Sequence, residues 1–121
     1  MIRAILLAAL APGVAAAEMY ECDILIRTGE VGKPVRPIDE GVLTVAVDGL
    51  RGTLAYPGGM RIEGAVTRER GYFYVEGADP AGARHDFVLF QAGAIFNVQI
   101  VGPAGRRGLG GECRRADQPR T

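Results

Sequence analysis

The sequence contains no serine and no tryptophan, and it has one histidine and two cysteines among its 121 residues. Without serine, His85 cannot form a Ser-His-Asp triad, and the adjacent Asp86 would point to the opposite face of a strand. One histidine and two cysteines are also too few ligands for a zinc site. We therefore expect no enzyme activity and no metal or cofactor, and we expect His85 at the surface or rim. A polar cleft converging on His85 would instead indicate an enzyme.

The chain also lacks an excess of charge of either sign. Its 14 basic and 14 acidic residues give a formal net charge of zero. A protein that neutralises many phosphates is expected to be basic, so nucleic acid is not expected as a partner. The 18 glycines have no three-residue period, which excludes collagen. They fall between short apolar runs, a distribution typical of all-β chains with many turns.

Long hydrophobic runs are missing except for residues 4–11. This run is less than half the length of about 20 residues that a membrane span requires. It follows Arg3 and precedes the small residues Ala15–Ala17, which is the pattern of a signal peptide. We expect a signal peptide at 1–17, cleaved after Ala17, and a single β-domain at 18–121. The mature protein would be periplasmic or secreted, without a stable membrane anchor.

After the expected cleavage site, apolar and polar residues alternate with a period of two, which predicts strands. The expected fold class is all-β, a small antiparallel β-barrel or β-sandwich of about eight short strands, because either arrangement protects the sheet edges. Turns are predicted at Asp48–Gly49, Pro57–Gly59, Glu69–Gly71, Asp79–Gly82 and Gln91–Gly93.

The pair Asp48–Gly49 fits the centre of a two-residue type I′ turn. A turn at this place would put Val47 opposite Leu50 and Val45 opposite Gly52, so that the apolar residues share one face. Two local alternatives remain open elsewhere in the chain. Either Phe73 or its neighbours Tyr72 and Tyr74 face the core, and residues 83–92 form either a strand, which we favour, or a short helix.

The first strand, from Met19 to Arg27, would place Tyr20, Cys22, Ile24 and Ile26 on one face. The last would do the same for Leu109, Gly111 and Cys113. In an oxidising compartment, an even pair of cysteines usually forms a disulfide. A bond between Cys22 and Cys113 would stabilise the fold by about 4–5 kcal/mol in the chain-entropy model.

The segment Tyr20–Asp23, with Cys113 near the end of the chain, resembles the periplasmic inhibitors of C-type lysozyme. The resemblance covers only these residues. It implies an eight-stranded barrel of similar size and an inhibitory function. The serine-containing inhibitory loop and the tryptophans of that family have no counterpart here, because the chain lacks both residue types.

We predict a non-enzymatic binding or accessory module, and the alternative is an inhibitor of a secreted hydrolase. The long loop of residues 28–40 would provide the contact surface for another envelope or secreted protein. The candidate contact residues are Val35, Arg36 and Ile38 in this loop and Arg114 and Arg115 near the C-terminus, which the disulfide would bring into one region. Alternatively, Val35 and Ile38 close one end of the barrel as a plug.

Overall fold

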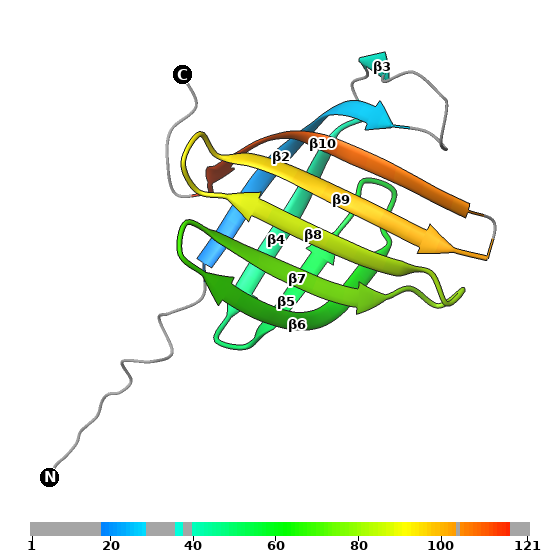
Figure 1. The fold of residues 1–121 in the computed structure, drawn as a ribbon, viewed down its shortest axis with the longest axis horizontal. Helices are drawn as coiled ribbons and strands as arrows, with labels where there is room; N and C mark the ends of the chain where they lie inside the picture. The colour runs from blue at the N-terminus through cyan, green and yellow to red at the C-terminus, as the bar shows by residue number, and fades with distance from the viewer. Residues whose placement is uncertain (1–17, 29–35, 38–39, 104, 117–121) are drawn as a thin grey trace, which may run out of the picture.

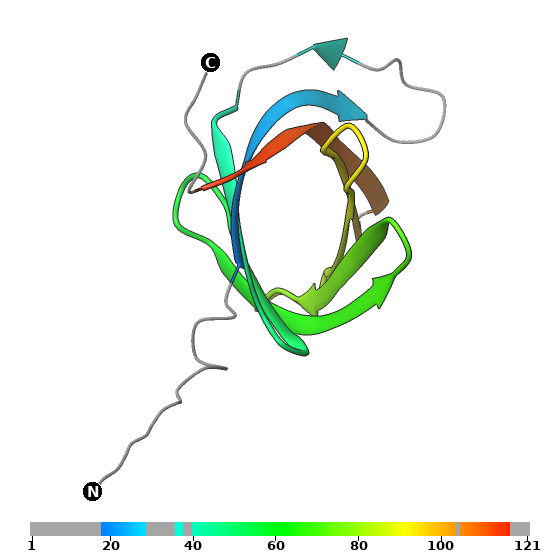
Figure 2. The ribbon, with the colours of Figure 1, turned by 90° about the vertical axis from the view of Figure 1, so that its left-hand side faces the viewer.

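The structure is a computed structural model that describes residues 18–28, 36–37, 40–103 and 105–116. Eight antiparallel strands close into a barrel, which confirms the predicted class and decides between barrel and sandwich (Figures 1 and 2). Each strand pairs with the next along the chain, and the last pairs with the first. The described residues include no helix that is long and apolar enough to cross a membrane.

The strands are labelled as in Figure 1. Their bounds are β2 (Glu18–Thr28), β4 (Val42–Asp48), β5 (Arg51–Ala55), β6 (Arg61–Glu69), β7 (Tyr72–Ala78), β8 (Arg84–Phe90), β9 (Ile95–Gly102) and β10 (Gly105–Arg115). A two-residue strand, β3 (Arg36–Pro37), pairs with the end of β2 outside the ring.

Alternate residues of each strand point into the barrel and form its core. Phe73, Phe87 and Phe96 are fully buried, and the ring centroids are 6.1 Å apart for Phe73–Phe87 and 5.7 Å apart for Phe87–Phe96. Burial of such a side chain stabilises a fold by about 1.5–3 kcal/mol. Because Phe73 faces inward, its neighbours Tyr72 and Tyr74 lie on the outer wall, which settles the alternative for this strand.

The turn between β4 and β5 lies one residue further along the chain than predicted. Asp48 still belongs to β4, and the two turn residues are Gly49 and Leu50. Gly49 has a φ of 64°, whereas Leu50 has no positive φ, a combination that fits a type II′ turn with glycine first. Val47 therefore pairs with Gly52, and the predicted pairing with Leu50 is wrong. A register shift of two residues preserves the faces, so Leu43, Val45, Val47 and Leu54 point inward as predicted. Leu50, which was predicted to share this face, is a turn residue and is 77% exposed.

Other turns agree with the prediction. Gly59 N donates to Tyr56 O over 3.1 Å, and Gly58 has a φ of 97°, as the third position of a type II turn requires. Residues 91–94 connect β8 to β9 in a hairpin. Residues 84–90 form a strand, so the competing short helix does not occur.

A β-bulge interrupts the pairing of β2 with β10. Ile24 and Ile26 pair with consecutive residues of β10, so Leu25 between them has no partner there. The extra residue reverses which side chains face inward beyond it. Ile26, predicted to face the core, is 39% exposed, and Arg27 instead lies opposite the buried Leu109 on the inner face. The bulge thereby directs an arginine toward the interior at one end of the barrel.

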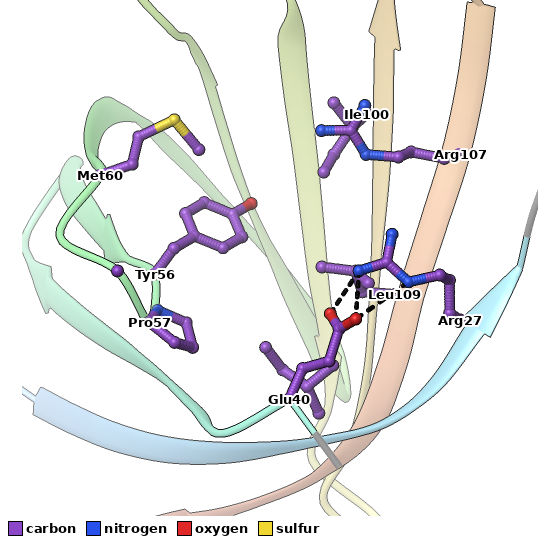
Figure 3. A pocket seen from close by; sticks show the side chains of 10 residues that line it. Arg27, Glu40, Tyr56, Pro57, Met60, Ile100, Arg107 and Leu109 are labelled. Atoms are coloured by element: carbon purple, nitrogen blue, oxygen red, sulfur yellow. Dashed lines mark hydrogen bonds and ion pairs between the residues drawn. The ribbon is translucent and has the colours of Figure 1, made fainter. Parts of the chain in front are cut away.

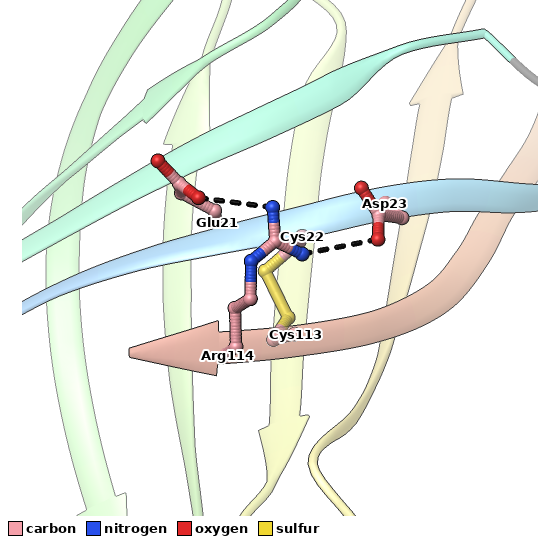
Figure 4. The surroundings of a disulfide bond; sticks show 5 residues. All are labelled: Glu21, Cys22, Asp23, Cys113 and Arg114. Atoms are coloured by element: carbon pink, nitrogen blue, oxygen red, sulfur yellow. Dashed lines mark hydrogen bonds and ion pairs between the residues drawn. A yellow bond between two sulfur atoms is a disulfide. The ribbon is translucent and has the colours of Figure 1, made fainter. Parts of the chain in front are cut away.

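The predicted disulfide between Cys22 and Cys113 is confirmed. The two residues are direct partners across β2 and β10, the strands whose pairing closes the barrel (Figure 4). Both side chains point inward and are buried.

Candidate functional site

A pocket of about 470 Å³ opens at the end of the barrel where β2 and β9 finish and β10 begins (Figure 3). Its apolar lining includes Ile24, Ile100 and Leu109, which come from β2, β9 and β10. Each of these side chains is buried in the core, so we call them the floor of the pocket. Pro57 and Met60, at the connection between β5 and β6, lie on the opposite side.

Three charged side chains also line this pocket. Arg27 binds Glu40 through both Nε and Nη2, and the Nε donates to Oε2 over 3.2 Å. Arg107, two residues before Leu109 on β10, also points into the pocket (Figure 3). Because Arg27 lies opposite Leu109, the two arginines are diagonal neighbours on one face of the sheet. Among the described residues, Arg107 has no ion-pair partner.

Tyr56 lines the pocket and begins a hydrogen-bonded chain behind it. Its hydroxyl oxygen is 2.8 Å from His85 Nδ1, and His85 Nε2 is 3.0 Å from Asp79 Oδ2. The other carboxylate oxygen, Asp79 Oδ1, accepts from Ala81 N and Ala83 N over 2.9 Å and 3.0 Å. An ionised carboxylate only accepts, so Nε2 donates to it, and in a neutral ring Nδ1 accepts the proton of Tyr56.

His85 is fully buried, so the prediction of a surface or rim position is wrong. It lies on the inner face of β8 opposite Ile100, and its burial is tolerated because both ring nitrogens have partners. Its neighbour Asp86 lies on the outer wall and binds Arg84, as strand alternation predicts. His85 does not line the pocket; Tyr56, to which it is hydrogen-bonded, does.

Two pKa shifts describe the electrostatics of this chain of hydrogen bonds. Burial raises the pKa of Tyr56 far above its usual value, and the positive charge of Arg107 opposes this effect. The hydrogen bond from His85, followed by the one from the backbone of Ala83, lowers the pKa of Asp79 below its usual value. At neutral pH, this series of hydrogen bonds therefore joins the protonated phenol of Tyr56 to the ionised carboxylate of Asp79.

The structure does not bring the predicted contact residues together. Arg36 pairs with Arg27 at the end of β2, whereas Arg114 and Arg115 pair with Glu21 and Tyr20 near its beginning. A rise of about 3.3 Å per residue separates these two places by roughly 20 Å along β2. The other two predicted residues, Val35 and Ile38, lie outside the described residues, as does most of the loop 28–40.

Arg114 and Arg115 line a smaller pocket of about 300 Å³ at the opposite end of the barrel. Arg114 lies beside the disulfide and donates to Glu21 and Asp23 over 2.9 Å and 3.1 Å (Figure 4). Arg115 approaches Glu18 at 3.5 Å. These carboxylates already neutralise the two arginines, which distinguishes them from Arg107.

Sequence reasoning did not identify Arg27, Tyr56 and Arg107 as parts of one site. One feature pointed toward it: Gly110 and Gly111 lie within a strand pattern, and glycine inside a strand often marks a bulge. Only the position of the bulge determines that Arg27 faces inward. In the described part of the chain, no group of three or more His, Cys, Asp or Glu side chains could hold a metal ion.

The pocket thus combines a buried apolar floor, one compensated arginine, one arginine without an ion-pair partner in the described ranges, and a phenol. Comparison of the chain with protein-family models, with curated proteins and with solved structures finds no match.

Proposed function

We propose that this protein is an exported, non-enzymatic binding module whose ligand site is the pocket lined by Arg27, Tyr56 and Arg107. The observation that carries the proposal is an open pocket of about 470 Å³ with a buried apolar floor and a few polar groups around it. Pockets that hold small molecules commonly have this size and composition. The interior of an eight-stranded barrel is just wide enough to be filled by side chains or to hold one small ligand, and here the pocket lies at one end of it.

The state of the polar groups supports binding over catalysis. Tyr56 is the only member of the Tyr56–His85–Asp79 chain that lines the pocket. Its raised pKa keeps the phenol protonated at neutral pH, so it is neither a nucleophile nor a base there. His85 has both ring nitrogens engaged and no exposed surface, so it serves to hold Tyr56 in place.

The Cys22–Cys113 disulfide supports the exported location. Disulfides persist in oxidising compartments and are rare in the cytosol. The disulfide and the signal-peptide pattern at 1–17 together favour the periplasm or the extracellular space as the compartment in which the protein binds its ligand.

The proposal is tested by adding small organic compounds of graded charge and hydrophobicity to the ¹⁵N-labelled mature domain and recording amide chemical shifts. We expect at least one compound to shift amides around Ile24, Tyr56 and Leu109. Met60→Trp, which fills the pocket from its rim, should abolish these shifts. Ile95→Trp is the matched control, because Ile95 is 52% exposed at the start of β9, near the opposite end of the barrel.

The proposal is wrong if no compound in the set shifts these amides. It is also wrong if Met60→Trp and the control variant bind every compound equally well, because the ligand would then lie elsewhere on the molecule.

A further inference from the structure

We infer that the ligand of this pocket is a small organic carboxylate with an apolar tail, bound with its carboxylate on Arg107 and its tail against Ile24, Ile100 and Leu109. This inference rests on the proposed function and specifies the chemistry of the molecule that the same pocket holds.

The charges of the pocket select an anion with a single negative charge. Arg27 and Arg107 contribute two positive charges on one inner face, and Glu40 neutralises Arg27. Within the described residues, one positive charge is left without a carboxylate. A monoanion would neutralise it, whereas a dianion would add an unpaired negative charge above an apolar floor, which is unfavourable.

The position of Arg107 places that charge next to apolar surface. Arg107 on β10 pairs directly with Ile100 on β9, and it lies two residues before Leu109 on its own strand. All three side chains therefore share the inner face. A ligand whose charged end meets Arg107 would therefore have its remaining atoms beside this floor. The planar guanidinium group can bind the two oxygens of a carboxylate at once, which favours this anion over a spherical one.

Arg107 is the principal hydrogen-bond donor to the anion, because the Tyr56 hydroxyl proton is already donated to His85. The Tyr56 hydroxyl lies 2.8 Å from His85 Nδ1, and its proton is donated to that nitrogen when the ring is neutral. A hydroxyl has only one proton, so Tyr56 cannot at the same time donate to a ligand. Its ring instead adds to the wall of the pocket near Met60 (Figure 3). Removal of the Arg107 charge should therefore remove most of the preference for anions.

The experiment compares three probes of equal chain length by isothermal titration calorimetry: octanoate, octan-1-ol and octylammonium, each below its micelle-forming or solubility limit. Each probe is titrated into the wild-type mature domain, into Arg107→Gln and into Arg106→Gln. Arg106 is the matched control, because it neighbours Arg107 and is exposed like Arg107 but does not line the pocket. Thermal unfolding of each variant confirms that it is folded.

We expect the wild-type domain to bind octanoate more tightly than octan-1-ol and to bind octylammonium most weakly. Arg107→Gln should weaken octanoate binding by about tenfold or more, as expected for the loss of a charge-assisted hydrogen bond. It should leave octan-1-ol binding unchanged, and Arg106→Gln should bind all three probes as the wild type does.

The inference is overturned, while the proposed function stands, if octan-1-ol binds as tightly as octanoate or if Arg107→Gln binds octanoate normally. It is also overturned if none of the three probes binds. In that case, the wider compound set tested with Met60→Trp decides whether the pocket is a binding site at all.

Discussion

His85 and Asp79 connect a surface turn to the interior of the barrel. The carboxylate of Asp79 accepts two backbone amides of its own turn, and its second oxygen accepts from the fully buried His85. This carboxylate therefore fixes both the turn before β8 and the imidazole ring behind Tyr56. The charge of Asp79 is best stabilised in the folded state, because its hydrogen bonds are absent from the unfolded chain.

We expect Asp79→Asn to reduce the loss of stability at acidic pH. The pKa of Asp79 in the folded state is below its ordinary value, mainly because of His85. The ionised group therefore stabilises the fold above the unfolded-state pKa of about 3.9, and this contribution is lost as the pH falls from there through the folded-state pKa. The measurement is the free energy of unfolding by urea between pH 2.5 and 7.

In the variant, this free energy should fall less steeply below about pH 4 than in the wild type, and it should be lower at pH 7. Asp48→Asn is the control, because Asp48 is an exposed carboxylate at the end of β4. An unchanged acid slope in Asp79→Asn would show that the hydrogen bonds of Asp79 do not stabilise its charge.

The bulge in β2 depends on a glycine in the neighbouring strand β10. A Cβ atom at Gly111 would overlap the carbonyl oxygen of Asp23, whereas one at Gly110 would lie 3.4 Å from the carbonyl oxygen of Phe96. Neither glycine has a positive φ, so steric space decides the outcome.

We expect Gly111→Ala to destabilise the domain by about 1–3 kcal/mol, the range found for overpacked interiors. Gly110→Ala, at the neighbouring position, should change stability much less, because its Cβ makes an ordinary contact. Chemical denaturation of both variants measures the difference. Equal stability of the two variants would mean that β2 and β10 separate easily at the bulge.

The strands could be predicted from sequence because each depends on local alternation and each hairpin on its own turn residues. The turn at Pro57–Gly59 and the strand of residues 84–90 were predicted for these reasons and are confirmed. The exact turn at Gly49–Leu50 was not, because a type I′ turn at Asp48–Gly49 and a type II′ turn at Gly49–Leu50 keep the same residues of the two strands inward, apart from Leu50 itself. The bulge at Leu25 depends on pairing with a strand more than 80 residues away, which no local pattern encodes.

The candidate site forms because the barrel closes. Arg27, Tyr56 and Arg107 come from three separate parts of the chain, and Arg27 and Arg107 become neighbours when β2 pairs with β10. Their spacing in sequence therefore contains no motif. The disulfide was predictable, because two cysteines allow one intramolecular pair, and the predicted pairing is confirmed.

We expect the closure of the barrel to depend strongly on the covalent bond between Cys22 and Cys113. Residues 22 and 113 are 91 positions apart, and a loop of this length implies a stabilisation of about 4–5 kcal/mol by the chain-entropy model. Each kcal/mol shifts the thermal midpoint of a domain this size by about 4–8 °C. We expect Cys22→Ala with Cys113→Ala to unfold at least about 15 °C below the oxidised wild type.

The variant should keep its far-ultraviolet circular dichroism at 25 °C, because hydrogen bonds still pair β2 with β10. Reductant should lower the midpoint of the wild type but not that of the variant, and equal midpoints without reductant would show that strand pairing alone closes the barrel.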